Sequence, residues 1–98
     1  MIDANQLRNI DTKLNRAQVV LNEYEAKVPG GDVGVRRVQT AIDNLFALFN
    51  RARKNPGSMS YDTDFAPGFQ QLDAEMADVA TRAGPLPNGD VEELGEQT

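Results

Sequence analysis

Apolar residues recur every three or four positions along three separate stretches of the chain, and this recurrence constrains the fold most. In the first stretch the intervals are 3, 4, 3, 4, 3 and 4, the spacing of one helix face in a bundle or coiled coil. The residues are Leu7, Ile10, Leu14, Ala17, Leu21, Tyr24 and Val28. Asp3 and Gln6 form a capping-box pattern ahead of this stripe, so the sequence predicts a helix over residues 4–27.

The same spacing returns in two later stretches, which predicts helices over residues 33–54 and 66–83. The second stripe consists of Val35, Val38, Ile42, Leu45, Phe49 and Ala52. The third stripe consists of Phe65, Phe69, Leu72, Met76, Val79 and Ala83. Ala41, Phe46 and Leu48 widen the apolar sector of the second helix to roughly 160°, more than one neighbouring helix needs. The second helix is therefore predicted to lie in the centre.

The segment between the first two stripes reads KVPGGDVGVRR and contains no phosphate-binding pattern. Pro29 cannot continue a helix, Gly30 and Gly31 tolerate positive φ, and Asp32 suits the N-cap of the next helix. The segment is therefore interpreted as a helix-reversing turn. Short connections of this kind join antiparallel neighbours.

These observations predict an all-α fold of the three-helix-bundle type. Residues 4–27 and 33–54 are expected to form an antiparallel helical hairpin, with a third helix over residues 66–83 packed on it. Two prolines and four carboxylates follow, so residues 1–84 are assigned to a helical domain and residues 85–98 to an acidic C-terminal tail.

The formal charge of −5 is unevenly distributed. Residues 1–31 carry four Lys/Arg against four Asp/Glu, residues 32–55 carry five against two, and residues 56–98 carry one against nine. A basic middle and an acidic end favour self-complementarity or a protein with a basic face as partner, whereas nucleic acid requires a positive footprint. We therefore expect protein partners and no nucleic acid.

The last turn of the second predicted helix is basic, with Arg51, Arg53 and Lys54. Because the tail is acidic, we expect it to dock on this basic cluster, of its own chain or of another protein. The tail residues expected to make the contact are Asp90, Val91, Glu92, Glu93 and Leu94. Exposed ion pairs contribute only about 0.2 to 1 kcal/mol each, so the two apolar residues would have to anchor the contact.

The residue types that most enzymes and metal sites require are missing or poorly placed. The chain has neither Cys nor His, which removes thiolate nucleophiles, the usual general base near neutral pH and the commonest metal ligand. The stretch Asp62–Asp73 resembles a calcium loop only superficially, since Pro67 stands where the sharp turn needs Gly. We expect no catalytic residues, no metal, no cofactor and no small-molecule substrate.

No segment is apolar enough to cross a bilayer: the longest apolar run is the five residues Leu45–Phe49, against about 20 for a spanning helix. The first residues also lack the pattern of a signal peptide. We expect a soluble protein without membrane contacts, either cytoplasmic or inside a virion or another assembled particle.

Three classes of function are compatible with the sequence. The first is a non-enzymatic structural or assembly protein whose helices pack against copies of itself or other subunits, as in phage particles and secretion machines. The second is an acidic binding module or inhibitor that occupies a basic surface, and the third, an enzyme, would require an unexpected pocket. The first is preferred, with the chain not a free monomer, because long heptad stripes suit packing between chains. The expected interface residues are Leu7, Ile10, Leu14, Leu21, Tyr24, Phe46, Phe49 and Phe69.

Overall fold

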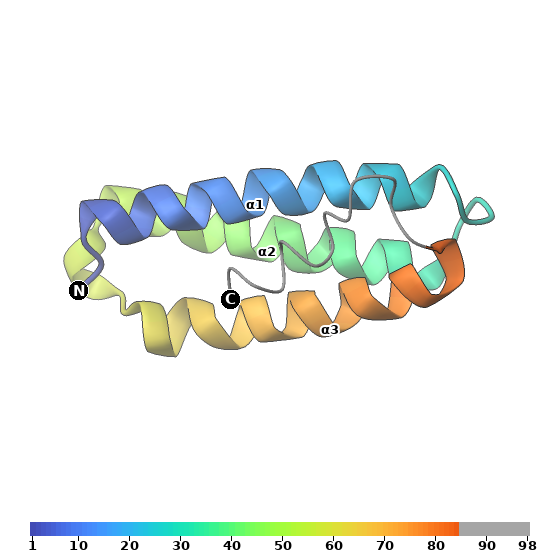
Figure 1. Ribbon diagram of the computed structural model, residues 1–98. Helices are drawn as coiled ribbons and strands as arrows, with labels where there is room; N and C mark the ends of the chain where they lie inside the picture. The colour runs from blue at the N-terminus through green and yellow to red at the C-terminus, as the bar shows by residue number, and fades with distance from the viewer. Residues whose placement is uncertain (85–98) are drawn as a thin grey trace.

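The computed structural model describes residues 1–84 as three long helices that run up, down and up along one axis (Figure 1). They are α1 (Ala4–Glu25), α2 (Val33–Lys54) and α3 (Ala66–Ala83). The all-α prediction is confirmed, and so is the antiparallel hairpin. The bounds of the second and third helices are as predicted, while α1 ends two residues earlier than residue 27.

Side chains close to each helix start explain where the first two helices begin. The backbone N–H of Gln6 donates to Asp3 Oδ1 at 2.8 Å, and the N–H of Asp3 donates back to Gln6 Oε1 at 3.1 Å, which completes the predicted capping box. Asp32 caps α2 in the same way, accepting from the Val35 N–H at 3.0 Å. Each cap satisfies backbone donors that have no partner within the helix.

The predicted helix-reversing turn lies between α1 and α2. Gly31 has φ +80°, a conformation that residues with a Cβ rarely adopt, and this explains why a glycine is required at this position. The turn returns the chain along α1, so α1 and α2 lie side by side and antiparallel (Figure 1).

The three apolar stripes face one another and form a single core. Helix α2 is central, as its wide apolar sector predicts: α1 and α3 each pack extensively on α2 and contact each other much less. Among the described residues no charged side chain is fully buried, and Tyr24 is the one fully buried side chain with a polar group. The largest side chains with almost no exposure are Tyr24, Phe65, Ile10, Leu14, Leu21, Ile42, Leu72 and Met76.

One ion pair fixes the end of α3 against the start of α2. Arg82 Nη2 lies 2.8 Å from Asp32 Oδ1, and Arg82 Nε donates to Asp32 Oδ2 at 3.1 Å. The hydrogen bond from Arg82 and the backbone N–H of Val35 hold the pKa of Asp32 below its ordinary value. Gly34 leaves room for this contact, because a Cβ there would meet the Arg82 guanidinium.

The connection between α2 and α3, predicted as a loop, contains two short helical turns. Pro56–Ser58 form a 3₁₀ turn, and Tyr61–Phe65 form a π-helical turn that continues directly into α3. Ile2 packs beneath this connection, only 2% exposed, and its N–H donates to the Pro56 carbonyl at 3.1 Å. The connection therefore closes one end of the core.

Candidate functional site

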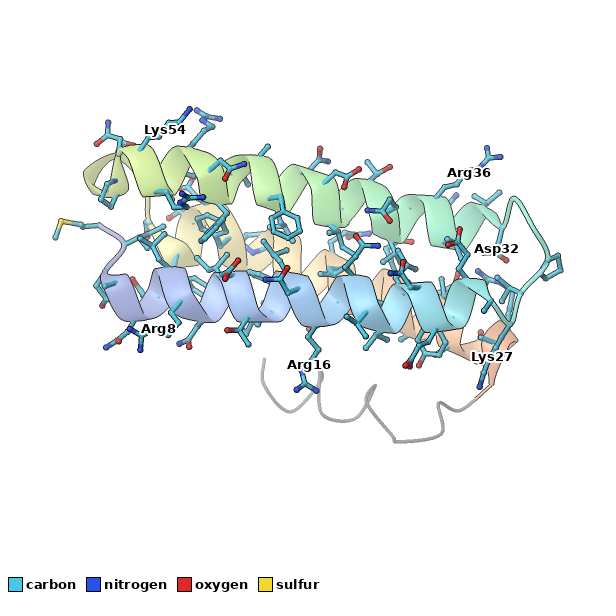
Figure 2. The ribbon with its side chains drawn as sticks, turned by 90° about the horizontal axis from the view of Figure 1, so that it is seen from above. Arg8, Arg16, Lys27, Asp32, Arg36 and Lys54 are labelled. Carbon is cyan, nitrogen blue, oxygen red and sulfur yellow. The ribbon has the colours of Figure 1, made fainter. Side chains whose placement is uncertain are left out.

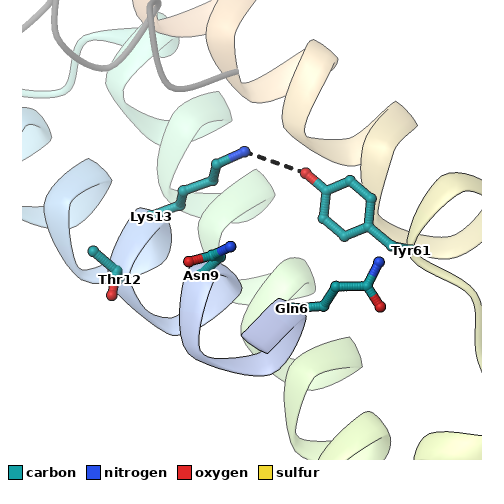
Figure 3. A pocket seen from close by; sticks show the side chains of 5 residues that line it. All are labelled: Gln6, Asn9, Thr12, Lys13 and Tyr61. Carbon is teal, nitrogen blue, oxygen red and sulfur yellow. Dashed lines mark hydrogen bonds between the residues drawn. The ribbon is translucent and has the colours of Figure 1, made fainter. Parts of the chain in front are cut away.

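A polar hollow of about 460 Å³ opens between the first half of α1 and the π-helical turn (Figure 3). It lies on the face where α1 and α3 pack least closely. We call it the Lys13–Tyr61 hollow, and its lining side chains are Gln6, Asn9, Thr12, Lys13 and Tyr61. Four of the five come from consecutive turns of α1, and the fifth comes from the π-helical turn.

Lys13 and Tyr61 point toward each other across the hollow and join α1 to the start of α3 (Figure 3). Lys13 Nζ donates to Tyr61 Oη at 3.2 Å and lies 5.1 Å from the centre of the Phe69 ring. The Tyr61 ring in turn stacks on Phe65 and Phe69, with centroids 6.2 and 6.3 Å apart. The ammonium group is therefore held by one hydroxyl and by the negative faces of aromatic rings.

The lining side chains offer more hydrogen-bond donors than the Lys13–Tyr61 bond uses. An ammonium group has three N–H donors, of which Tyr61 accepts one, and the tyrosine hydroxyl retains its own proton as a donor. Asn9 and Thr12 add groups that both donate and accept. This set suits a carboxylate beside a stretch of polypeptide backbone, whose own N–H and C=O groups need both kinds of partner.

A row of charged side chains continues from the hollow along α1. From Asn9 the intervals are 4, 3, 4, 3 and 4, but the fourth position is Val20, which is fully buried in the core, and the last follows the end of α1. Its polar members are Asn9, Lys13, Arg16, Glu23 and Lys27. Figure 2 shows Arg16, on α1, and Lys27, just beyond its end, extending away from α2. Three cations against one carboxylate make this row positive, and we call it the α1 basic row.

The structure places the predicted interface residues in the core of their own chain. Ile10, Leu14 and Tyr24 are fully buried, and Leu21 is almost so. Phe49 and Phe69 are also buried, whereas Leu7 and Phe46 are partly buried and pack against the same core. The heptad stripes are thus occupied by packing within one chain, so contacts with other chains would use other surfaces.

The basic cluster of Arg51, Arg53 and Lys54 lies at the far end of α2 from the point where the tail begins. The Arg82–Asp32 pair holds the end of α3 at the start of α2, and Figure 2 shows Lys54 and Asp32 at opposite ends of the bundle. Arg53 lies over the Phe49 ring at 5.7 Å. The tail residues of the predicted contact, Asp90, Val91, Glu92, Glu93 and Leu94, are outside the described residues.

In residues 1–84 no group of three or more Asp or Glu side chains is arranged to hold a metal ion. A second, shallower hollow separates α2 from α3 and is lined by Arg36, Arg37 and Glu75 among others. None of the three helices is long and apolar enough to span a membrane.

Comparisons with protein-family models, with curated proteins and with solved structures found no match to this chain. The fold and the site therefore rest on the chain's own residues.

Two features of the sequence could have indicated the hollow, although the three apolar stripes do not include them. Tyr61 precedes Phe65 by four residues and Phe69 by eight, so it extends the third stripe backwards by one turn. Lys13 belongs to the polar row that runs parallel to the apolar stripe of α1. No sequence pattern predicts the π-helical turn, which brings Tyr61 within hydrogen-bonding distance of Lys13 on α1.

Proposed function

We propose that this chain is a non-enzymatic structural or assembly protein that binds another polypeptide at the Lys13–Tyr61 hollow. This is the class of function that the sequence favoured. The proposed contact with the partner, however, lies on the face of α1 beside α3 and not on the heptad stripes. A subunit of a larger assembly, such as a phage particle or a secretion machine, is the expected partner.

The observation that carries this proposal is the fixed position of Lys13 over the aromatic rings of Tyr61 and Phe69. Tyrosine is among the residues that contribute most to protein interfaces. Here the aromatic platform is built into the core through Phe65 and Phe69, so its side chains lose little freedom on binding. The amide and hydroxyl groups of the lining match a polypeptide backbone.

The alternative function is an acidic module or inhibitor that occupies a basic surface of a partner. Residues 1–84 are close to neutral, with ten Lys/Arg against eleven Asp/Glu, and residues 85–98 add four carboxylates and no cation. This distribution favours a module that acts through its tail. Such a complex would weaken steeply as salt is added, whereas a contact on the aromatic platform would weaken less.

Site-specific photo-cross-linking tests the proposal. A photoreactive residue at Asn9 in the full chain is expected to cross-link one defined partner in an extract of the native source, identified by mass spectrometry. Lys13→Glu should abolish that cross-link. The substitution removes the cation that would bind the partner's carboxylate and puts a second carboxylate in its place.

The matched control is Arg37→Glu, which makes the same change of charge on α2, away from the hollow. It should leave the cross-link intact. Equal loss in both variants would mean that overall charge governs binding, and cross-linking from Asn44 instead of Asn9 would place the interface on α2; either result contradicts the proposal.

A further inference from the structure

We propose that the acidic tail of the chain, residues 85–98, docks in cis on the Lys13–Tyr61 hollow and the α1 basic row. This replaces the basic cluster of Arg51, Arg53 and Lys54 as the expected docking surface. The inference concerns the chain alone and does not rest on the proposed function. Because the tail and the proposed partner would occupy the same hollow, a partner that binds there would have to displace the tail.

Charge complementarity is the first argument. The tail carries Asp90, Glu92, Glu93 and Glu96 and no cation. The α1 basic row provides Lys13, Arg16 and Lys27, with Glu23 as its one carboxylate. Because Lys13 Nζ is already positioned by Tyr61 and Phe69, a carboxylate that reaches it meets an ammonium group whose side chain is partly ordered.

The reach of the chain is the second argument. The turn that follows α1 ends at Asp32, and the Arg82–Asp32 pair therefore places Gly84 near the end of α1 as well. From Glu25 back to Lys13 is about 18 Å of helix. Six to nine residues separate Gly84 from Asp90 and Glu93, a span of about 20 to 30 Å when extended.

The same reach argues against the basic cluster on α2. Helix α2 has 22 residues, so Lys54 lies about 30 Å beyond its first turn, where α3 ends. An extended chain covers about 20 Å from Gly84 to Asp90, about 30 Å to Glu93 and about 40 Å to Glu96, so of the four carboxylates only Glu96 reaches Lys54 with length to spare. The α1 basic row is within reach of all four.

The apolar residues of the tail provide the third argument. Val91 and Leu94 are three positions apart, so one turn of helix would present both on the same side. The half-buried Tyr61 ring offers them an apolar surface next to Lys13. Burial of these side chains would add to ion pairs that are individually weak in water.

Paramagnetic relaxation enhancement tests the inference, and the chain suits it because it contains no cysteine of its own. A spin label at Gly95→Cys in the full ¹⁵N-labelled chain is expected to broaden the amide signals of Asn9, Lys13 and Tyr61. The signals of Asn50 and Lys54 should keep their intensity.

Charge reversal gives the matched variants. Lys13→Glu with Arg16→Glu should abolish the broadening, and adding Glu92→Lys with Glu93→Lys should restore it. Arg36→Glu with Arg37→Glu makes the same change of charge on α2 and should have no effect. The amide spectrum of each unlabelled variant checks that the bundle is folded.

Three results would overturn docking in cis. They are uniform intensity at all sites, broadening confined to the end of α2, and broadening seen only when labelled and ¹⁵N chains are mixed as separate molecules. None of these results contradicts the proposed function, because a tail that is not docked leaves the hollow open to a partner. Conversely, a missing cross-link from Asn9 to a partner, with the broadening at Asn9 and Lys13 intact, would contradict the proposed function and leave the docked tail in place.

Discussion

Single side chains in the core set the stability of the bundle, and Leu45 is the clearest case. It lies on the central helix, is only 2% exposed, and packs so closely on α3 that a Cβ at Gly68 would lie 2.7 Å from its Cδ2 atom. The close approach of the helices at this point depends on a glycine facing a leucine. The heptad spacing predicts the leucine as core but gives no reason for the glycine, because the distance between helices is a tertiary property.

Replacement of Leu45 by alanine is expected to lower the free energy of unfolding by about 2 to 5 kcal/mol, since it leaves a cavity between α2 and α3. Urea denaturation followed by circular dichroism measures this change. Leu48→Ala, at a partly buried position of the same helix, provides the control and should cost less. A loss below about 0.5 kcal/mol for Leu45 would show that the packing described here is wrong.

At the scale of elements, the structure follows the sequence closely where periodicity and capping act together. Asp3, Gln6 and Asp32 cap helices as predicted, and the Pro-Gly turn reverses the chain. The π-helical turn was not predicted: Tyr61 and Phe65 continue the spacing of the third stripe, but this spacing does not distinguish a π-helical turn from an additional turn of α-helix. The residues of this turn are ordered by Phe65 in the core and by the Lys13 contact, which are long-range interactions.

The joint between α2 and α3 should respond to acid. Asp32 is only 11% exposed in its ion pair, and Arg82 and the Val35 N–H lower its pKa from the ordinary 3.8. The unfolded chain therefore binds this proton more readily than the folded chain. The stabilisation is complete above the ordinary Asp pKa and is lost as pH falls through the lowered pKa of the folded state.

Asp32→Asn tests this effect, because asparagine also caps helices but cannot form the ion pair. The variant should be less stable than the parent chain at neutral pH, and this gap should close below about pH 4. Thermal unfolding across that range provides the measurement, with the exposed Asp62→Asn as the control. If the difference in stability between the variant and the parent chain did not change with pH, the ion pair would not be its cause.

At the scale of the whole molecule, the core closes within one chain. The three stripes are buried by intramolecular packing except at Leu7, Val28 and Ala83, which are partly buried, so we expect residues 1–84 to fold as a unit without a partner. A chain truncated after Gly84 should unfold cooperatively, lose less stability than Leu45→Ala costs, and scatter light as a monomer at low micromolar concentration. If the truncated chain forms dimers, the heptad stripes also serve contacts between chains. If it fails to fold, the bundle requires the tail.

Because the bundle of residues 1–84 has three antiparallel helices, the start of α1 and the end of α3 lie at opposite ends of it. At one pole the Ile2 N–H donates to the Pro56 carbonyl in the connection between α2 and α3. At the other pole Gly84 follows Arg82, which pairs with Asp32, and the body between them is 42 Å long (Figure 1). Residues 1–84 therefore form an elongated body whose two ends lie at opposite poles. A neighbour attached at Met1 and one attached beyond Gly84 would be kept about a helix length apart, a spacing set by the number of turns in the helices.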